Sequence, residues 1–279
     1  MKLRAISGAC FVAIVAGFFL LRELVDYRLF DFLIWFLCGA GTFEVARALK
    51  PRLGRGAFVA LCVYGAAYVP FYALFEYLLW NGMGWVFALS LTIIFCAVMF
   101  ECRGGEEDTE RSSAVFLPVL YPSVLLLTML ALNGHRLGFT ALLLVFVISP
   151  LTDTFAYLVG KTYGMLRGGK VKKLCPAISP NKTVAGALGG LAGGVIGAFI
   201  VYFAVRPDIG SSVPALIFAA IGLAGAVFTQ AGDLFESLIK RRAGIKDMGK
   251  IMPGHGGVMD RIDGISFASA FIWFVFLWI

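Results

Sequence analysis

Long apolar runs separated by short polar segments are the feature of this sequence that most constrains its fold. A helix of about 20 residues crosses the hydrocarbon core of a bilayer, where only helices and closed barrels satisfy their own backbone hydrogen bonds. Hydrophobic residues make up 60% of the 279 residues and charged residues only 15%, with a mean hydropathy of +0.88. We therefore predict an all-α, polytopic integral membrane protein with about nine transmembrane helices, over residues 5–21, 29–48, 56–79, 83–99, 114–132, 137–159, 184–205, 213–239 and 265–279.

The distribution of Lys and Arg predicts the orientation. With nine spans, 20 of the 24 Lys and Arg residues fall on one side, and only Arg22, Arg28, Arg136 and Arg206 fall on the other. Because positively charged loops stay in the cytoplasm, we expect a cytoplasmic amino terminus and an external carboxyl terminus in the cell inner or plasma membrane. The first run is long enough to span, so no cleavable signal peptide is expected. The expected large partner is the lipid bilayer, and no nucleic acid is expected.

The densest group of polar residues lies between Gln230 and Ser266. Gln230, Asp233 and Ser237 share one helix face at spacings i, i+3 and i+7. Carboxylates offer the hard oxygen ligands that Mg²⁺ prefers, and Lys and Arg beside them neutralise a polyphosphate. The glycines at 254, 256 and 257 allow the backbone to approach a ligand closely. This composition predicts phosphate chemistry at a membrane surface.

These features divide the chain into two predicted regions. Residues 1–136 hold about five spans and few polar side chains, whereas residues 137–279 form the predicted catalytic region, with cytoplasmic loops at 160–183 and 240–264. The span at 184–205 carries glycines at spacings of four, a pattern that lets helix backbones approach closely. We expect that face to pack within the same chain, and a homodimer is left open. The six cysteines show no paired spacing, so neither a disulfide framework nor a zinc site is predicted.

Three sequence blocks carry a resemblance to a known family. The first runs Ser237-x-Ile-Lys-Arg, Lys246-Asp-x-Gly and Pro253-x-His-Gly-Gly-Val-x-Asp-Arg-x-Asp263. The second is Asp153-x-x-Ala-Tyr-x-x-Gly-Lys-x-x-Gly164, and the third is Ser179-Pro-Asn-Lys-Thr183. In the order in which they occur along the chain, from Asp153 to Asp263, these blocks resemble those of the phosphatidate cytidylyltransferases, also called CDP-diacylglycerol synthases. Met252 and Gly264 depart from the usual residues of that signature, but neither change removes a metal or phosphate ligand.

The resemblance implies a reaction and a set of site residues. The reaction is CTP plus phosphatidic acid giving CDP-diacylglycerol and pyrophosphate, with Mg²⁺ as cofactor and a second cation left open. The implied metal ligands are Asp233, Asp260 and Asp263. The expected catalytic residues are Asp233, Asp260, Lys182, Lys240, Arg241 and His255. The expected substrate-binding residues are Ser179, Asn181, Lys182, Thr183, Asp153, Tyr157, Lys161, Ser237, Lys246, Asp247, Gly256, Gly257 and Arg261.

Simpler structural roles stay open for several of these residues. The block around Lys182 is expected at a helix amino terminus, where N–H groups favour an anion, but a capped helix with a snorkelling lysine has the same pattern. Asp153 could form a structural ion pair with Lys161. Glu236 is a weaker metal ligand that could instead pair with Lys240 at i+4. Glu44 and Glu76 receive no role beyond an internal hydrogen bond or a cavity lining.

Two other functions are weighed against cytidylyl transfer. One is a different CTP- or CDP-dependent membrane lipid enzyme, such as a polyprenol kinase. The other is an ion-coupled transporter that uses Asp153 and Asp233 as a path. Transporters often contain internal repeats and midplane binding sites, whereas this sequence shows no repeat and gathers its polar residues on one side. We therefore favour the enzyme.

Overall fold

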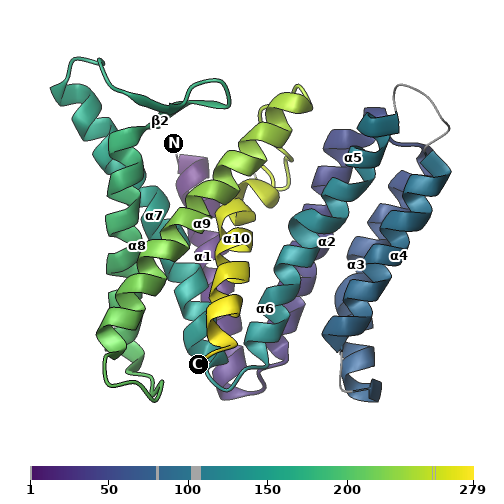
Figure 1. Ribbon diagram of the computed structural model, residues 1–279, viewed down its shortest axis with the longest axis horizontal. Coiled ribbons are helices and arrows are strands. Elements are labelled where there is room, and N and C mark those ends of the chain that lie inside the picture. Colours follow the sequence, from purple (N-terminus) through teal and green to yellow (C-terminus); the bar gives the residue numbers. More distant parts are fainter. Residues whose placement is uncertain (1, 80–81, 102–107, 253, 255) are drawn as a thin grey trace. The chain divides into compact units, whose positions relative to one another are not determined.

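The computed structural model describes residues 2–79, 82–101, 108–252, 254 and 256–279, and these are almost entirely helical (Figure 1). The helices are α1 Lys2–Leu24, α2 Leu29–Leu49, α3 Arg55–Leu79, α4 Gly82–Glu101, α5 Asp108–Pro118, α6 Leu125–Asn133, α7 Gly138–Leu166, α8 Val184–Val205, α9 Pro214–Arg242 and α10 Met259–Phe276. There are also two short helical segments: η1 Lys50–Arg52 follows α2, and η2 Val119–Val124 joins α5 to α6. Strands β1 Lys173–Cys175 and β2 Ser179–Thr183 form one antiparallel hairpin.

The helix lengths and compositions confirm an all-α, multi-pass membrane protein. Within the described ranges, seven helical segments are long and apolar enough to cross a bilayer, the η2 interruption being counted inside one of them. Helices α4 and α10 lie on the other two expected spans. The count of nine spans stays a prediction.

The contacts divide the chain into two compact units. The first unit comprises residues 1–134 and 243–262, and the second comprises residues 135–242 and 263–279. The loop between α9 and α10 therefore packs with the amino-terminal helices, and the division falls inside α10.

The first unit is built around α2. This helix contacts α1, α3, α5, α6 and η2, and its buried face includes Phe30, Ile34 and Leu37. Two pairs of buried hydroxyls in this unit, Thr42–Ser123 and Tyr64–Ser90, form hydrogen bonds, which offset the cost of removing these groups from water. The Thr42 and Ser123 hydroxyl oxygens are 2.6 Å apart, for example.

The second unit packs α7, α8 and α9 through the glycines of α8. A Cβ atom on Gly186 would lie 2.7 Å from the carbonyl oxygen of Ala156 in α7, and one on Gly194 would lie 2.6 Å from that of Gly222 in α9. These distances leave no room for a side chain, so the helix backbones are in direct contact. The expectation that the glycine face packs within the chain is confirmed.

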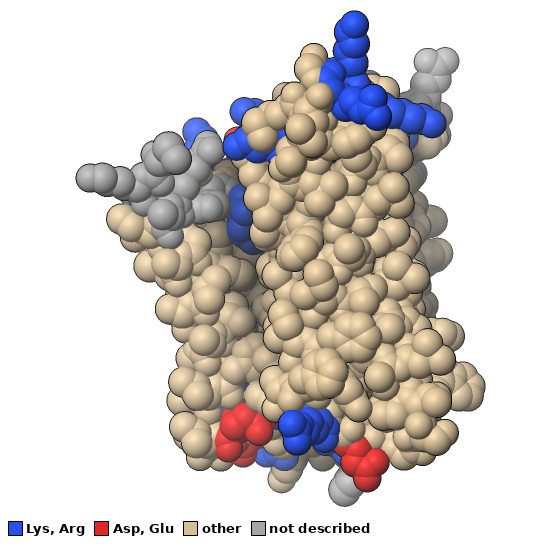
Figure 2. All heavy atoms as spheres, turned by 90° about the vertical axis from the view of Figure 1, so that its left-hand side faces the viewer, with Lys and Arg blue, Asp and Glu red and all other residues tan. Residues whose placement is uncertain are grey.

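The outer surface of the second unit suits a lipid environment. Leu188, Ile200, Phe203 and Leu216 are each at least half exposed on α8 and α9. Figure 2 shows a largely uncharged surface along the middle of one face, with Lys and Arg gathered at one end and charges of both signs at the other. Exposed apolar side chains between charged ends are typical of transmembrane helices.

The ends of several elements differ from the sequence predictions. Helix α7 continues to Leu166 and α9 to Arg242, while α10 begins at Met259, which shortens the second polar loop to residues 243–258. The segment Ser179–Thr183, expected at the amino terminus of a helix, forms strand β2, which leads directly into α8. Only Thr183 has the predicted capping role, because its extended backbone ends the hairpin and its side chain caps α8. Pro180 fits the edge of a two-stranded sheet, where its missing N–H costs little.

Candidate active site

An ion pair between β2 and α9 lies at the centre of the candidate site in the second unit. The Lys182 Nζ atom is 2.5 Å from Asp233 Oδ2, and the two side chains are 24% and 30% exposed. The hairpin reaches α9 at a second point, where the Arg241 Nε–H donates to the Ile178 carbonyl oxygen at 3.2 Å. Residues more than 50 positions apart in the sequence are thereby brought together at the charged end of α9.

The polar face of α9 continues this cluster. The Ser237 hydroxyl lies 3.5 Å from Asp233 Oδ1, one helical turn away, as the i, i+4 spacing allows. Lys240 forms an ion pair with the buried Glu236 carboxylate. Of the two roles left open for Glu236, the structure therefore shows the ion pair with Lys240 at i+4.

Asp263 adds a buried carboxylate from the first turns of α10. It is 9% exposed, and its Oδ1 accepts a hydrogen bond of 2.8 Å from the Gly264 N–H. A Cβ atom on Gly232 would lie 2.5 Å from the Asp263 carbonyl oxygen, so α9 and α10 are in backbone contact at this point. The Asp263 carboxyl lies within electrostatic range of three other carboxyl groups, those of Glu236, Asp233 and Asp153. The second unit thus concentrates negative charge beside Lys182.

Several other predicted residues of the second unit lie on α7 and on the hairpin. The Thr183 hydroxyl oxygen accepts the Gly186 N–H at 3.0 Å, so it caps α8. The Lys161 ammonium lies 5.5 Å from the centre of the exposed Tyr157 ring, a cation–π contact on α7. Ser179 is half-buried and Asn181 is exposed on the hairpin.

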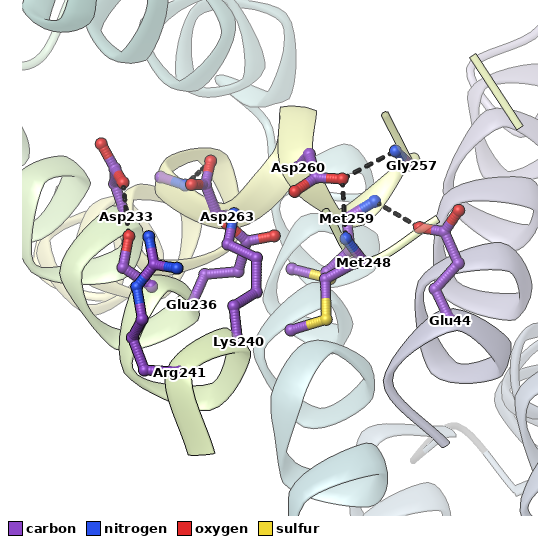
Figure 3. Close-up of polar contacts among 12 residues, drawn as sticks. Glu44, Asp233, Glu236, Lys240, Arg241, Met248, Gly257, Met259, Asp260 and Asp263 are labelled. Atoms are coloured by element: carbon purple, nitrogen blue, oxygen red, sulfur yellow. Dashed lines mark hydrogen bonds and ion pairs between the residues drawn. The ribbon is translucent and has the colours of Figure 1, made fainter. Parts of the chain in front are cut away.

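In the first unit, Asp260 holds the polar loop in shape. Its Oδ2 accepts the Gly257 N–H at 2.7 Å and the Met248 N–H at 3.0 Å, which joins both arms of the loop (Figure 3). Gly256 has a φ of +91°, a conformation that favours glycine. The predicted residues Lys246, Asp247 and Arg261 are exposed. His255 lies outside the described residues.

The comparisons with known proteins identify the family. The profile of the cytidylyltransferase family matches residues 2–279. This chain belongs to that family. It is 38% identical to a phosphatidate cytidylyltransferase of Brucella abortus (strain 2308) over 191 residues, which cover 68% of this chain and 65% of that protein.

Two further relatives are also named phosphatidate cytidylyltransferase. The protein of Bacillus subtilis (strain 168) is 38% identical over 143 residues, or 51% of this chain and 49% of its own length. The protein of Helicobacter pylori (strain J99 / ATCC 700824) is 31% identical over 285 aligned positions, which cover 99% of this chain and 94% of that protein. The alignment with the Brucella relative thus spans slightly less than two thirds of that protein, whereas the Helicobacter alignment spans almost the whole of both chains.

The carboxylates of this cytidylyltransferase-family chain fit a divalent cation chemically. Mg²⁺ commonly binds through one or two carboxylates together with substrate phosphates. Asp233 and Asp263 supply such oxygens in the second unit, where a cation would offset the repulsion between the Asp263 carboxyl and its carboxyl neighbours. Among the residues that the structure describes, no three His, Cys, Asp or Glu side chains are arranged to hold one ion. The three-carboxylate site that includes Asp260 therefore stays a prediction.

Glu44, for which the sequence predicts no functional role, lies against the polar loop of the first unit. Glu44 is fully buried on α2, and its Oε2 accepts the Met259 N–H at 2.8 Å. An acidic residue inside an apolar run is costly and usually has a polar partner, so the sequence contained a signal. The partner, 215 residues later, could not be found from local pattern.

Proposed function

We propose that this protein catalyses cytidylyl transfer from CTP to phosphatidate. An oxygen of the phosphatidate phosphate attacks the α-phosphorus of CTP. The bond from the α-phosphorus to the oxygen bridging to the β-phosphorus breaks, and pyrophosphate leaves with that electron pair. CDP-diacylglycerol remains in the bilayer. The observation that carries this proposal is the Lys182–Asp233 pair, which joins the sequence block Ser179–Thr183 to the polar face of α9, one turn before the block that begins at Ser237.

The residues around this pair suit a reaction between two anions. Lys182, Lys240 and Arg241 place three positive charges on β2 and the end of α9. Their role is to neutralise and orient the phosphates, with Lys182 exchanging its contact with Asp233 for one with the substrate. The attacking phosphate is already ionised near neutral pH, so the reaction needs no strong protein base. Positioning and preorganised charge are then the main sources of rate enhancement.

A bound Mg²⁺ ion would supply charge neutralisation and orientation of the phosphate oxygens. Asp233 is the first residue proposed to hold it, with Asp260 as the second ligand and Asp263 as a third carboxylate. The burial of Asp263 among other carboxyl groups supports its place beside a cation. A negative cluster without a cation would be destabilised by mutual repulsion.

We also propose that the site faces the cytoplasm, as the Lys and Arg distribution predicts. Contacts within each unit support a shared side for the basic loops. Arg241 at the end of α9 bonds to the hairpin, and Arg52 after α2 lies 3.1 Å from Glu110 at the start of α5. CTP would then enter from the cytoplasm, while the acyl chains of phosphatidate stay in the bilayer.

The proposal is tested with purified protein in mixed lipid–detergent micelles. CTP labelled in its cytosine ring is incubated with Mg²⁺ and phosphatidate, and the lipid phase is separated and counted. We expect a labelled CDP-lipid whose formation requires phosphatidate. Diacylglycerol serves as the matched control lipid, because it has the same chains without the phosphate. Label transfer with diacylglycerol, or none with phosphatidate, would refute the proposed reaction.

A further inference from the structure

Glu44 lies in the first unit at the boundary between an apolar helix and the polar loop of residues 243–258. Its side chain is 0% exposed. A carboxylate buried in this way is expensive unless hydrogen bonds or a partner offset the lost hydration. Oε2 has such a bond, from the Met259 N–H at 2.8 Å, whereas Oε1 has no hydrogen-bond partner among the described residues.

The loop is shaped around this carboxylate. A Cβ atom on Gly249 or on Gly257 would collide with the Glu44 carboxylate oxygens. Neither glycine has a positive φ angle, so backbone conformation does not require glycine at these two positions. Glycine is required there because the Glu44 carboxylate occupies the space that a side chain would take.

Glu44 and Asp260 hold the same short stretch of backbone. Glu44 bonds to the N–H of Met259 and lies against Gly257, while Asp260 bonds to the N–H of Gly257 and of Met248 (Figure 3). Asp260 directly follows Met259 in the chain. A shift of the Met259 backbone therefore moves the Asp260 carboxylate with it.

We infer that Glu44 is a positioning residue, which fixes the start of α10 and the two loop glycines so that Asp260 is held in one place. This role belongs to the amino-terminal helices, which otherwise lack the sequence blocks of the site. The effect on turnover rests on the proposed function, because it assumes that Asp260 acts in cytidylyl transfer. The effect of Glu44 on the conformation of the loop does not depend on the proposed function.

The first test is a double-mutant cycle between Gly257 and Glu44. Gly257→Ala adds a methyl group where the carboxylate lies, and we expect a loss of turnover of about 100-fold, since a misplacement of about 1 Å can cost that much. Glu44→Asp withdraws the carboxylate by one methylene group. In the Gly257→Ala background, Glu44→Asp should raise turnover by at least about tenfold, because the effects of substitutions at groups in contact are not additive. Losses that simply multiply would overturn the inference.

The second test measures the loop without any activity assay. Lys250 is exposed within the loop, so limited trypsin digestion in detergent reports how firmly the loop is held. We expect faster cleavage after Lys250 in Glu44→Ala, and near-normal cleavage in Glu44→Gln, which keeps an acceptor for the Met259 N–H. Cleavage after the exposed Lys173 of the hairpin is the internal reference, and Glu110→Ala, at an exposed glutamate, is the matched control.

The outcomes of the two tests are distinct. Unchanged cleavage at the loop in Glu44→Ala would overturn the positioning role even if cytidylyl transfer is established. A wild-type protein with no transferase activity would overturn the proposed function and leave the cleavage result to decide the role of Glu44. If Glu44→Ala does not fold, the restoration of Gly257→Ala by Glu44→Asp decides the question through cleavage rates as well as turnover.

Discussion

Removing the Lys182 ammonium is the substitution whose effect can best be worked out from the structure. Lys182→Ala deletes the charge that lies 2.5 Å from Asp233 Oδ2 in a site where both side chains are at most 30% exposed. A hydrogen bond between charged groups contributes about 1.5–3 kcal/mol. Partial exposure places the stability loss at or below the lower end of that range.

The expected loss of turnover is larger than the loss of stability. A preorganised donor that meets developing charge typically contributes a factor of about 10²–10³ to kcat, so Lys182→Ala should fall in that range. Lys182→Arg should not restore full activity, because a planar guanidinium does not replace a compact ammonium at a fixed point. The assay is steady-state cytidylyl transfer at saturating phosphatidate, with kcat and the KM for CTP measured separately.

Lys172→Ala is the matched control for this prediction. Lys172 precedes the same hairpin and is exposed, so its loss should change kcat by less than about twofold, as for surface charges generally. Thermal unfolding of each variant shows whether the protein remains folded. Wild-type kcat and KM in a folded Lys182→Ala protein would refute the assignment of Lys182 to phosphate binding.

Three further predictions follow from the fold and the charges. Asp233→Asn and Asp260→Asn should each lower kcat by about 10²–10³-fold, and Asp263→Asn should lower it by about 10–100-fold if Asp263 acts through other ligands. The activity of each variant is titrated against Mg²⁺, and normal turnover at low Mg²⁺ would contradict the metal assignment. Gly194→Leu should cost about 1–3 kcal/mol of unfolding free energy, because the helix backbones meet there. Gly164→Ala, at a position with no other atoms nearby, should be neutral or stabilising. Equal melting temperatures for the two variants would contradict the packing. Topology reporters should be cytoplasmic in the hairpin and external at the carboxyl terminus, and a cytoplasmic carboxyl terminus would refute the predicted orientation.

The helices could be predicted from the sequence because the bilayer fixes both their length and their composition. Some of their ends could not: α8 has the predicted bounds of 184 and 205, but α7 continues for seven residues past the expected end of its apolar run at 159. A helix end depends on capping and on neighbouring chain, and hydropathy reports neither. The strand at Ser179–Thr183 was missed for a related reason: its pairing with Lys173–Cys175 comes from the hairpin and not from local apolar alternation.

The candidate site was predictable in its residues and less so in its contacts. The sequence predicts Lys182 from the block Ser179–Thr183 and Asp233 from a polar helix face, but their contact depends on the hairpin reaching α9. The Asp260 carboxylate was expected as a metal ligand, and its bonds to two loop N–H groups were not expected. Glu44 shows the limit most clearly, because its loop partners lie some 200 residues away and no local pattern connects them.

The central claim is that the cytidylyl group, and not a terminal phosphate, is transferred to lipid. The direct measurement compares two parallel reactions of the purified protein with phosphatidate, one with CTP labelled at the α-phosphorus and one with CTP labelled at the γ-phosphorus. Cytidylyl transfer predicts that α-label appears in the lipid phase while γ-label appears only in pyrophosphate, in equal molar amounts. Label from the γ-phosphorus in the lipid, with none from the α-phosphorus, would indicate a lipid kinase and contradict the account.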